Sequence, residues 1–258
     1  MRHVSPGDAS LPPPQEADSA FDEVKRHDAI LLGAIGDPRI EVGLLEFGII
    51  AKLRFELDLY VNLRPIKLYA EHLCPLKDKK PEDVDFVVVR ENAEDAYAGM
   101  RGSFEEVGRE YPDIARDHAY IDAATMWCVK NPEWFDTVVT SNMFGDILTD
   151  LAAMIQGGLG IAASGNIHPG RVSLFESIHG SAPKYAGKNV ASPIATIMAV
   201  QMLLDYLGET RAAARIEETV AGLIRVRKIP SLGSDSGLST SPLGDMVAEA
   251  LERAKVPA

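Results

Sequence analysis

Two short apolar runs, VDFVVVRE at 84–91 and FDTVVTSN at 135–142, constrain the fold of this chain most strongly. Each has the length of a strand and a centre of consecutive apolar residues, FVVV in the first and VV in the second, which is typical of a strand buried on both faces of a sheet. Helical patterns follow at about 145–155, 193–207 and 211–225. Strands that alternate with helices predict an α/β fold with substantial parallel pairing.

The part of the chain before these runs contains further expected elements. Residues 1–19 are rich in Pro, Ser and Asp, and we expect a disordered tail there. A short helix around AFDEVKRHD precedes a strand at 29–36. A longer helix spans about 44–57 and is followed by the extended run DLYVNLRPIKLY.

Charge and composition exclude several classes of partner. The net charge of −12 argues against nucleic acid or an anionic membrane surface as the main partner. Cys74 and Cys128 lack the spacing of a metal site, so we expect two reduced, partly buried thiols. The chain has no apolar run of membrane-spanning length and no signal-peptide pattern, so we expect a cytoplasmic protein.

Three arginines lie beside extended or helical segments: Arg54 in KLRFELD, Arg64 in NLRPIK and Arg90 in VVVREN. The guanidinium group offers a rigid fork of donors that matches a carboxylate, so three of them suit a dicarboxylate or tricarboxylate substrate. Taken singly, each is more often a surface or ion-pair arginine.

Asp146 and Asp150 lie four residues apart in FGDILTD. At this spacing two side chains stack on one face of a helix, where like charges are unfavourable by about 0.2–0.5 kcal/mol. One reading is a solvated helix face. The apolar LAAM that follows suggests a buried turn instead and favours a bound Mg²⁺ or Mn²⁺, to which Asp122 offers a third carboxylate.

Two segments, GGLGIAASGN at 157–166 and FESIHGSAPKYAGKN at 175–189, are rich in glycine and small residues. Such residues let backbone amides approach a phosphate or ribose closely. Neither segment matches the dinucleotide fingerprint or a P-loop, so alone they are a weak indication of a nucleotide site.

Six segments, taken together and in order, resemble the isocitrate/isopropylmalate (β-decarboxylating) dehydrogenase family. The resemblance runs from about Ala20 to Leu251 and is closest to the isopropylmalate branch. The segments are GAIGDP, LRFELDLYVNLRPIKLY, VVVRENAEDAYAG, FDTVVTSNMFGDILTDLAAM, GGLGIAASGNI and HGSAPKYAGKNVASP.

This resemblance implies a fold and an activity. The fold would be a two-domain α/β structure with a mixed, largely parallel sheet. Residues 20–59 and 157–258 would form the nucleotide-binding domain, and 60–156 the substrate, metal and dimerisation domain. The activity would be NAD-dependent oxidative decarboxylation of 3-isopropylmalate, with isocitrate or tartrate as alternative substrates.

The resemblance also implies roles for individual residues. Asp146 and Asp150 would bind Mg²⁺ or Mn²⁺ together with Asp122 from the neighbouring subunit of a homodimer. Tyr97 would protonate the product enol as a general acid. The substrate carboxylates would be bound by Arg54, Arg64 and Arg90. The cofactor would be bound by Glu176, His179, Gly180, Ser181, Ala182, Pro183, Lys184, Tyr185 and Ser192.

Lys184 bears on the choice of cofactor, because it stands where NAD-specific members place an acidic residue that binds the ribose. The pair Lys184-Tyr185 resembles NADP-dependent isocitrate dehydrogenases, where such a pair contacts the 2′-phosphate. A solvent-facing Lys184 is the simpler reading. We expect NAD, with NADP as the alternative. Ser177 and Ser192 depart from the family's usual proline and asparagine.

Two family segments have no counterpart in this sequence. One is the first strand with its glycine-containing turn. The other would lie between AYAGMRG at 96–102 and FEEVGREYPD at 104–113, where the family carries several dozen residues with the catalytic lysine and the arm that clasps the partner subunit. No lysine occurs between Lys80 and Lys130. We therefore expect impaired activity and weakened dimerisation, or a non-catalytic remnant.

Overall fold

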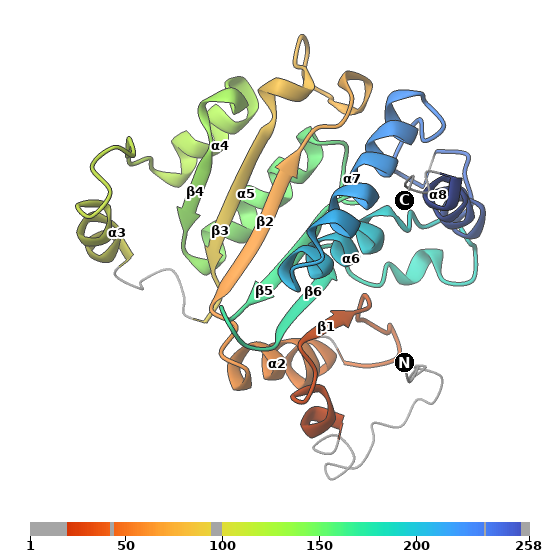
Figure 1. Ribbon diagram of the computed structural model, residues 1–258, viewed down its shortest axis with the longest axis horizontal. Coiled ribbons are helices and arrows are strands. Elements are labelled where there is room, and N and C mark those ends of the chain that lie inside the picture. The colour runs from red at the N-terminus through yellow and green to blue at the C-terminus, as the bar shows by residue number, and fades with distance from the viewer. Residues whose placement is uncertain (1–19, 42–43, 94–99, 235, 254–258) are drawn as a thin grey trace.

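The protein is built on a six-stranded sheet (Figure 1). The computed structural model describes residues 20–41, 44–93, 100–234 and 236–253. The strand order across the sheet is β1-β6-β5-β2-β3-β4. The strands are β1 (Ala29–Leu32), β2 (Val61–Lys67), β3 (Asp85–Glu91), β4 (Thr137–Thr140), β5 (Ala163–Ile167) and β6 (Ser173–Ser177).

The sheet is mixed, as predicted, but it is less parallel than expected. β1 pairs with β6 and β3 with β4 in parallel, whereas the three pairings between them are antiparallel. The connection from β2 to β3 and that from β5 to β6 contain no α-helix. A parallel pair needs a long crossover, usually helical, so strands joined by these connections run antiparallel.

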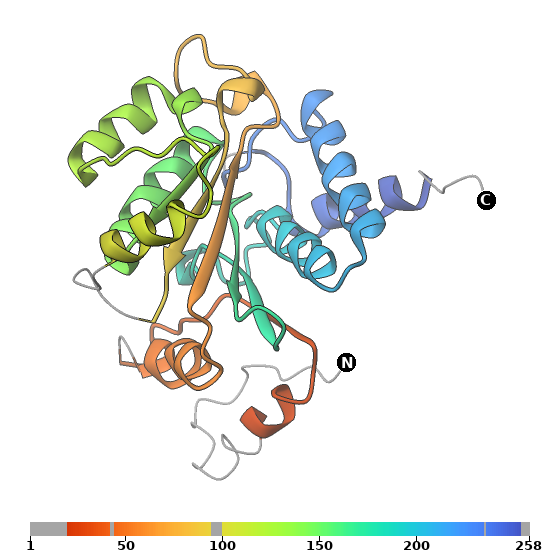
Figure 2. The same ribbon diagram turned by 60° about the vertical axis from the view of Figure 1, so that its left-hand side comes forward.

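Helices cover both faces of the sheet (Figures 1 and 2), and the α/β fold class is confirmed. The α-helices are α2 (Lys52–Glu56), α3 (Met100–Gly108), α4 (Ile121–Lys130), α5 (Asn142–Ile155), α6 (Ile194–Tyr206), α7 (Thr210–Arg225) and α8 (Thr240–Arg253). A π-helical stretch over Glu46–Ala51 leads directly into α2.

Side chains on β2 alternate between the two faces of the sheet, as the pleat of a strand requires. Asn62, Arg64 and Ile66 are buried, and the residues between them are half-buried. We call the face that carries Arg64 the arginine face and the other the opposite face. The same alternation continues on β3, where Arg90 is buried.

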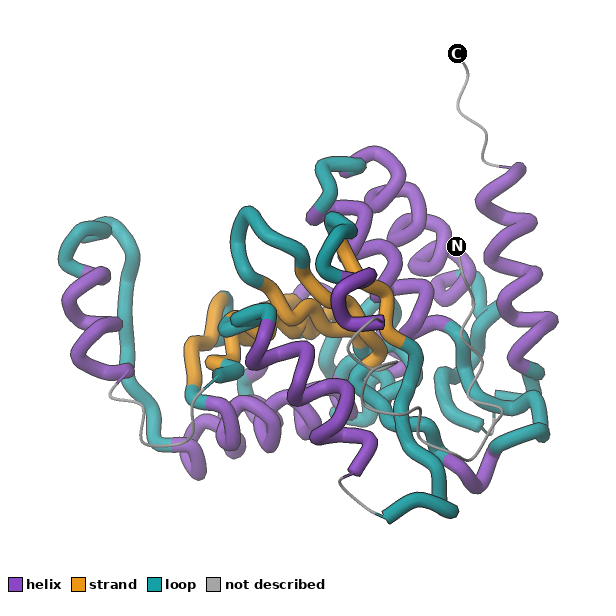
Figure 3. The backbone as a smooth tube through the Cα atoms, turned by 90° about the horizontal axis from the view of Figure 1, so that it is seen from below, coloured by secondary structure: helices purple, strands orange, loops and turns teal. Residues whose placement is uncertain are grey.

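Separate apolar clusters pack on the two faces of the sheet, and Figure 3 shows helices on both of its sides. On the arginine face, Ile66 and Val88 pack against Leu148 of α5, and Leu174 packs against Leu53 of α2. On the opposite face, β5 and β6 pack against α6, α7 and α8, with Phe175 among the buried residues. The arginine face is therefore covered by α2 and α5.

The predicted elements agree with the structure apart from their ends, with one further correction: β4 was expected to be buried on both faces, but it is an edge strand on which Val139 is 44% exposed. The helices expected at 145–155, 193–207 and 211–225 are α5, α6 and α7, and the extended runs form β2, β3 and β4. The strand expected over 29–36 ends at Leu32, and the rest of it is a loop in which Gly36 has a φ of 142°. The tail expected at 1–19 lies outside the described residues.

α3 and the chain that follows it extend away from the rest of the molecule (Figures 1 and 3). The extension is held by its own contacts: His118 Nε2 lies 2.8 Å from Glu105 Oε1, and the His118 ring lies edge-on to Phe104. Among the described residues no helix has the length and apolar character that crossing a membrane requires. The expected division into two domains stays a prediction.

Candidate active site

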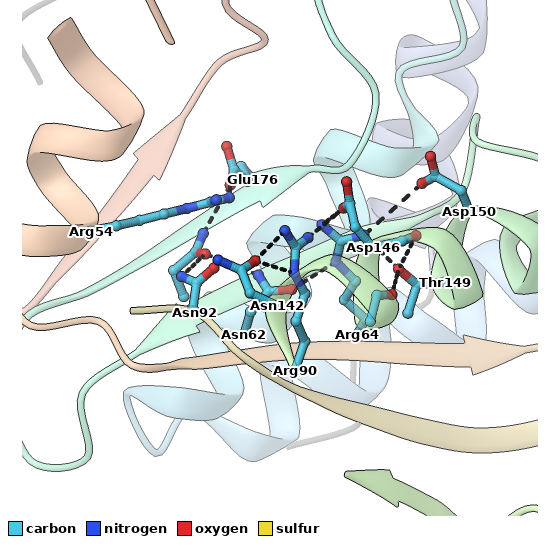
Figure 4. Close-up of polar contacts among 12 residues, drawn as sticks. Arg54, Asn62, Arg64, Arg90, Asn92, Asn142, Asp146, Thr149, Asp150 and Glu176 are labelled. Carbon is cyan, nitrogen blue, oxygen red and sulfur yellow. Dashed lines mark hydrogen bonds and ion pairs between the residues drawn. The ribbon is translucent and has the colours of Figure 1, made fainter. Parts of the chain in front are cut away.

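The three predicted arginines converge on the arginine face of the sheet (Figure 4). Arg64 and Arg90 come from the neighbouring strands β2 and β3, where Asn62 pairs with Arg90 and Arg64 with Val88. Only 4% of Arg64 and 7% of Arg90 is exposed. Arg54 reaches the same region from α2. The sheet register and α2 thus gather three positive charges that lie far apart in the sequence.

Both aspartates of FGDILTD face this cluster from α5. Asp146 Oδ1 lies 3.1 Å from Arg64 Nη2 and also pairs with Nη1 of Arg90. Asp150 Oδ1 lies 4.0 Å from Arg64 Nη1. The buried turn suggested by the sequence is not found, because Asp146 and Asp150 are 51% and 62% exposed. Their like charges, one helical turn apart, are offset by the neighbouring guanidinium groups.

Gly145 explains how Arg90 reaches Asp146. A Cβ atom at Gly145 would lie 2.7 Å from Cγ of Arg90 and 2.9 Å from Cγ2 of Thr140. Contacts under 3.0 Å do not occur without displacement. The glycine of FGD therefore lets the Arg90 side chain cross the first turn of α5.

Neutral polar residues hold the two buried guanidinium groups in position. Arg64 donates from Nε to Asn62 Oδ1 at 2.7 Å and from Nη1 to Thr149 Oγ1 at 2.6 Å. Arg90 donates from Nε to Asn142 Oδ1 at 2.9 Å. A buried arginine needs such partners for its five N–H donors, since unpaired buried charge is strongly unfavourable. The sequence reasoning did not single out these three residues.

A chain of buried hydrogen bonds connects the neighbourhood of Arg54 with that of Arg64. Glu176 Oε1 accepts from Arg54 Nη2 at 3.2 Å and from Asn166 Nδ2 at 2.8 Å. Asn166 Oδ1 in turn accepts from Asn62 and Asn92, each at 2.9 Å. In the sequence, the feature that could have predicted this network is asparagine at inward-facing positions of strands. A buried amide needs a hydrogen-bond partner, so such asparagines are expected to pair with one another.

Burial shapes the charge state of the site. Burial, together with the neighbouring Arg64, lowers the pKa of Arg90 to about 10. Burial also lowers the pKa of Arg64, although Asp146 opposes this. The pKa of Asp150 is raised by burial and by the charge of Asp146. Ionised groups are thus held at this site against desolvation, a condition common at functional sites.

Two predicted site residues are not placed in this cluster. Asp122 lies in the first turn of α4, is exposed, and accepts a hydrogen bond from the backbone of Ala123. Within the described ranges no three His, Cys, Asp or Glu side chains gather as a metal site. The expectation that Asp122 acts across a subunit interface stays a prediction. Tyr97 lies outside the described residues.

A cavity of about 330 Å³ lies beside the loop after β1 and is lined by part of the HGSAP motif. Gly36 and Asp37 form one wall, and 180–183 form another. Ala182 has a φ of 45° and precedes a short 3₁₀ turn at Pro183–Tyr185. Small residues and a tight turn bring backbone close to the cavity, which suits a phosphate or ribose.

The other residues expected at the cofactor site do not line this cavity, and their role stays a prediction. Glu176 belongs to the arginine cluster. His179 is half-exposed and contacts the backbone of Gly180. Ser192 donates to the Gly160 carbonyl at 3.1 Å near the start of α6. Lys184 Nζ lies 4.8 Å from the centre of the Tyr185 ring.

The fold and this constellation agree with the comparisons to known proteins. The model of the family described as "Isocitrate/isopropylmalate dehydrogenase" matches residues 12–106 and 100–247. This chain belongs to the isocitrate/isopropylmalate dehydrogenase family, whose members are oxidoreductases.

Among its relatives, the 3-isopropylmalate dehydrogenase of Thermobifida fusca is 39% identical over 294 residues, covering 90% of this chain and 82% of the relative. That of Beutenbergia cavernae is 42% identical over 284 residues, covering 86% and 80%. The solved isocitrate dehydrogenase of Methylococcus capsulatus has a TM-score of 0.79 at 31% identity, covering 91% of this chain and 84% of that one. The TT0538 protein of Thermus thermophilus has a TM-score of 0.81 at 31% identity; 95% of this chain is covered but only 59% of that one.

The comparisons also bear on the gap expected inside the chain. The two family matches overlap at residues 100–106, so the second match resumes where the first ends. The alignment to the Thermobifida relative spans 294 positions, but only about 232 residues of this chain, 90% of 258, take part in it. Roughly 60 aligned positions of the relative therefore have no counterpart in this chain. These matches do not contradict the internal gap expected between 96–102 and 104–113, and its position stays a prediction.

Proposed function

We propose that this chain binds 3-isopropylmalate at the arginine cluster and takes part in its NAD-dependent oxidative decarboxylation. The observation that carries the proposal is the convergence of Arg54, Arg64 and Arg90 with Asp146 and Asp150 on one face of the sheet. Relatives named 3-isopropylmalate dehydrogenase, at about 40% identity over most of the chain, support it.

The arginines would bind the two carboxylates of the substrate. The hydrogen bonds to Asn62, Thr149 and Asn142 restrict how the guanidinium groups can turn. A fixed guanidinium fork binds a carboxylate with two parallel hydrogen bonds, which orients as well as attracts it. Desolvation lowers the pKa of Arg64 and Arg90, so an added carboxylate is favourable for their charged forms.

The aspartates would hold a divalent cation. Their carboxylate oxygens suit Mg²⁺ or Mn²⁺, and both side chains are about half exposed or more, at 51% for Asp146 and 62% for Asp150. Asp150, whose pKa is raised partly by Asp146, would be relieved by a cation between them. Two carboxylates leave positions for the substrate and for Asp122 of a second subunit.

The cavity lined by Gly36 and 180–183 would take part of the nucleotide cofactor. We favour NAD, and Lys184 beside Tyr185 supplies the specific reason to test NADP. When bound, the cation would supply Lewis acidity at the substrate oxygen and the cofactor would accept a hydride. The protein's own side chains would orient the substrate carboxylates and protonate the product. Tyr97 is the proposed acid for that protonation.

Substrate choice would depend on the segment before Arg54. Gly48, Ile49 and Ile50 present small and apolar groups within the π-helical stretch. These groups suit an isopropyl substituent better than the additional carboxylate of isocitrate. Isocitrate and tartrate are the alternative substrates, because the arginines and aspartates would serve them equally.

We further propose a homodimer formed through α4 and α5. Met126 and Val129 of α4 and Met143 and Ile147 of α5 are exposed apolar side chains on neighbouring helices. Apolar groups gathered in this way are typical of an interface. The missing arm would leave the dimer weak. A cytoplasmic location, in which the free thiols Cys74 and Cys128 persist, is part of this proposal.

The internal gap leads us to propose low activity for this chain. Proton transfer by a positioned side chain contributes typically 10²–10⁴-fold to a rate. The family's catalytic lysine is absent, and no lysine between Lys80 and Lys130 could replace it. The test is NADH formation from 3-isopropylmalate with Mn²⁺, run beside a version with the missing segment restored. Slow turnover by this chain and a clear gain on restoration support the proposal. Faster turnover of isocitrate, or equal rates from both versions, contradicts it.

A further inference from the structure

A second cavity, of about 360 Å³, lies on the opposite face of the sheet, away from the arginine cluster. Its floor is made by side chains of β2, β5 and β6, and its other walls come mainly from α6 and α7. Its size is at the lower end of the range for sites that enclose a small organic molecule. The proposed function makes no use of this cavity.

The cavity combines an apolar interior with an acidic edge. Leu63, Ile167, Phe175 and Met198 contribute apolar surface. Three carboxylates also line it, and they belong to Asp85, Asp205 and Glu217. Against these three negative charges stands the single ammonium group of Lys67 among the lining residues.

The charge of Lys67 is already engaged. Its Nζ lies 2.7 Å from Glu217 Oε1, and the same oxygen accepts from the Tyr69 hydroxyl at 3.2 Å. Although partial burial opposes it, the contact with Glu217 raises the pKa of Lys67. The charge of Glu217 is thus largely matched, and Asp85 and Asp205 leave the lining with a net negative charge.

A buried amide adds a hydrogen-bond donor to the lining. Gln156 is 3% exposed, and its Oε1 accepts from the backbone N–H of Lys67 at 2.9 Å. Its Nε2 has no hydrogen-bond partner in the part of the chain that the structure describes. A buried donor without a partner is unfavourable, and a ligand oxygen would satisfy it.

The geometry points to a binding site for a small organic monocation: an ammonium group for the acidic edge, an apolar body for the floor, and a hydroxyl or carbonyl oxygen for Gln156. An organic anion of the same shape would meet uncompensated carboxylates and is disfavoured. The assignment does not depend on the function proposed for the arginine cluster.

The site shares two elements with the arginine cluster. Leu63 and Lys67 line the cavity from the opposite face of β2, while Arg64 points to the arginine face. Gln156 is the residue at the C-terminal end of α5, the helix that carries Asp146 and Asp150. A ligand in the cavity therefore contacts the strand and the helix that position the cluster.

The test uses L-phenylalaninol, which has an ammonium group, a hydroxyl and a benzyl group, and measures its binding to the full chain by calorimetry. 3-Phenylpropionate and 3-phenylpropan-1-ol serve as the anionic and neutral probes. We expect saturable binding of phenylalaninol, weaker binding of the alcohol and weaker still of the anion. Asp205→Asn should weaken phenylalaninol binding about tenfold, and Glu217→Gln should also weaken it.

Glu218→Gln is the matched control, because Glu218 is exposed on α7 and does not line the cavity. It should leave the affinity for phenylalaninol unchanged. Thermal unfolding of each variant shows whether it is folded. Tighter binding of the anion than of the amine overturns the assignment, and so does an amine affinity that neither Asp205→Asn nor Glu217→Gln lowers.

Discussion

Arg64 and Asp146 form an ion pair between β2 and α5, with 3.1 Å between Nη2 and Oδ1. Arg90 pairs with the same carboxylate oxygen. The pair therefore ties the helix that carries both aspartates to two strands of the sheet. It also means that the groups proposed to bind the cation and those proposed to bind the substrate neutralise one another in this structure.

Asp146→Asn should lower the free energy of unfolding by about 1–3 kcal/mol, because two buried guanidinium groups lose their shared carboxylate. The partial exposure of Asp146 keeps the effect below that of a fully buried pair. Asp150→Asn is the comparison, since Asp150 lies 4.0 Å from Arg64 and should matter less. Urea unfolding measures both. Equal stability of the two variants would show that the pair does not hold α5 in place.

Gly145→Ala should lower the free energy of unfolding by about 1–3 kcal/mol, since the new methyl group would overlap the stem of Arg90. Gly244→Ala in α8 is the matched control, because nothing lies within 4 Å of a Cβ there. Alanine is the better helix former by roughly 1 kcal/mol, so the control should be neutral or stabilising. If both substitutions behave alike, Arg90 does not cross the helix as described.

Cys128 should react with thiol reagents very slowly in the native protein. Burial raises the pKa of its thiol from 9.0 to about 11, and the thiolate is the reactive form. The Cys128 thiol loses its proton at a lower pH in the unfolded chain than in the folded protein. Ionisation of this thiol therefore lowers the free energy of unfolding as the pH rises from about 9 to 11.

Labelling with and without denaturant, followed by mass spectrometry of the peptides, gives the rate for each cysteine. Cys74, half-buried, should label faster than Cys128. In Cys128→Ala the part of the pH dependence due to this thiol should disappear. Rapid native labelling of Cys128 would refute its burial.

Asp150→Asn should weaken Mn²⁺ binding measured by electron paramagnetic resonance, because one of the two proposed carboxylate ligands loses its charge. Asp136→Asn is the control, since Asp136 is exposed and follows Phe135 outside the cluster. We expect weak binding even in the parent chain, as two carboxylates make an incomplete site. Equal Mn²⁺ affinity in Asp150→Asn and the parent would contradict the proposal that the cation binds at α5.

The sequence predicted the elements well where a pattern was continuous. The apolar runs of β3 and β4 and the helical patterns of α5, α6 and α7 are all found. The pairing directions were less accessible, because which strands become neighbours depends on long-range packing. β5 and β2 are adjacent and antiparallel although about a hundred residues separate them.

The charged part of the site was predictable, and the neutral part was not. Arginine and aspartate stand out beside strands, and the structure gathers them. Asn62 shows only as an amide at an inward-facing position of a strand. Thr149 carries no signal, since its role depends on contact with Arg64 across the fold. Glu176 was expected at the cofactor, and that role stays a prediction. The sequence did not show its contact with Arg54, which arises because β6 and α2 are neighbours on the arginine face.

The central claim is that the arginine cluster binds a 2-hydroxy dicarboxylate. Calorimetric titration of 3-isopropylmalate with Mn²⁺ into the parent chain and into Arg64→Lys tests it most directly, with Arg171→Lys as an exposed control. Lysine keeps the charge but loses the two-pronged geometry, so affinity should fall at least about tenfold in Arg64→Lys. It should be unchanged in the control. Unchanged affinity in Arg64→Lys would contradict the account.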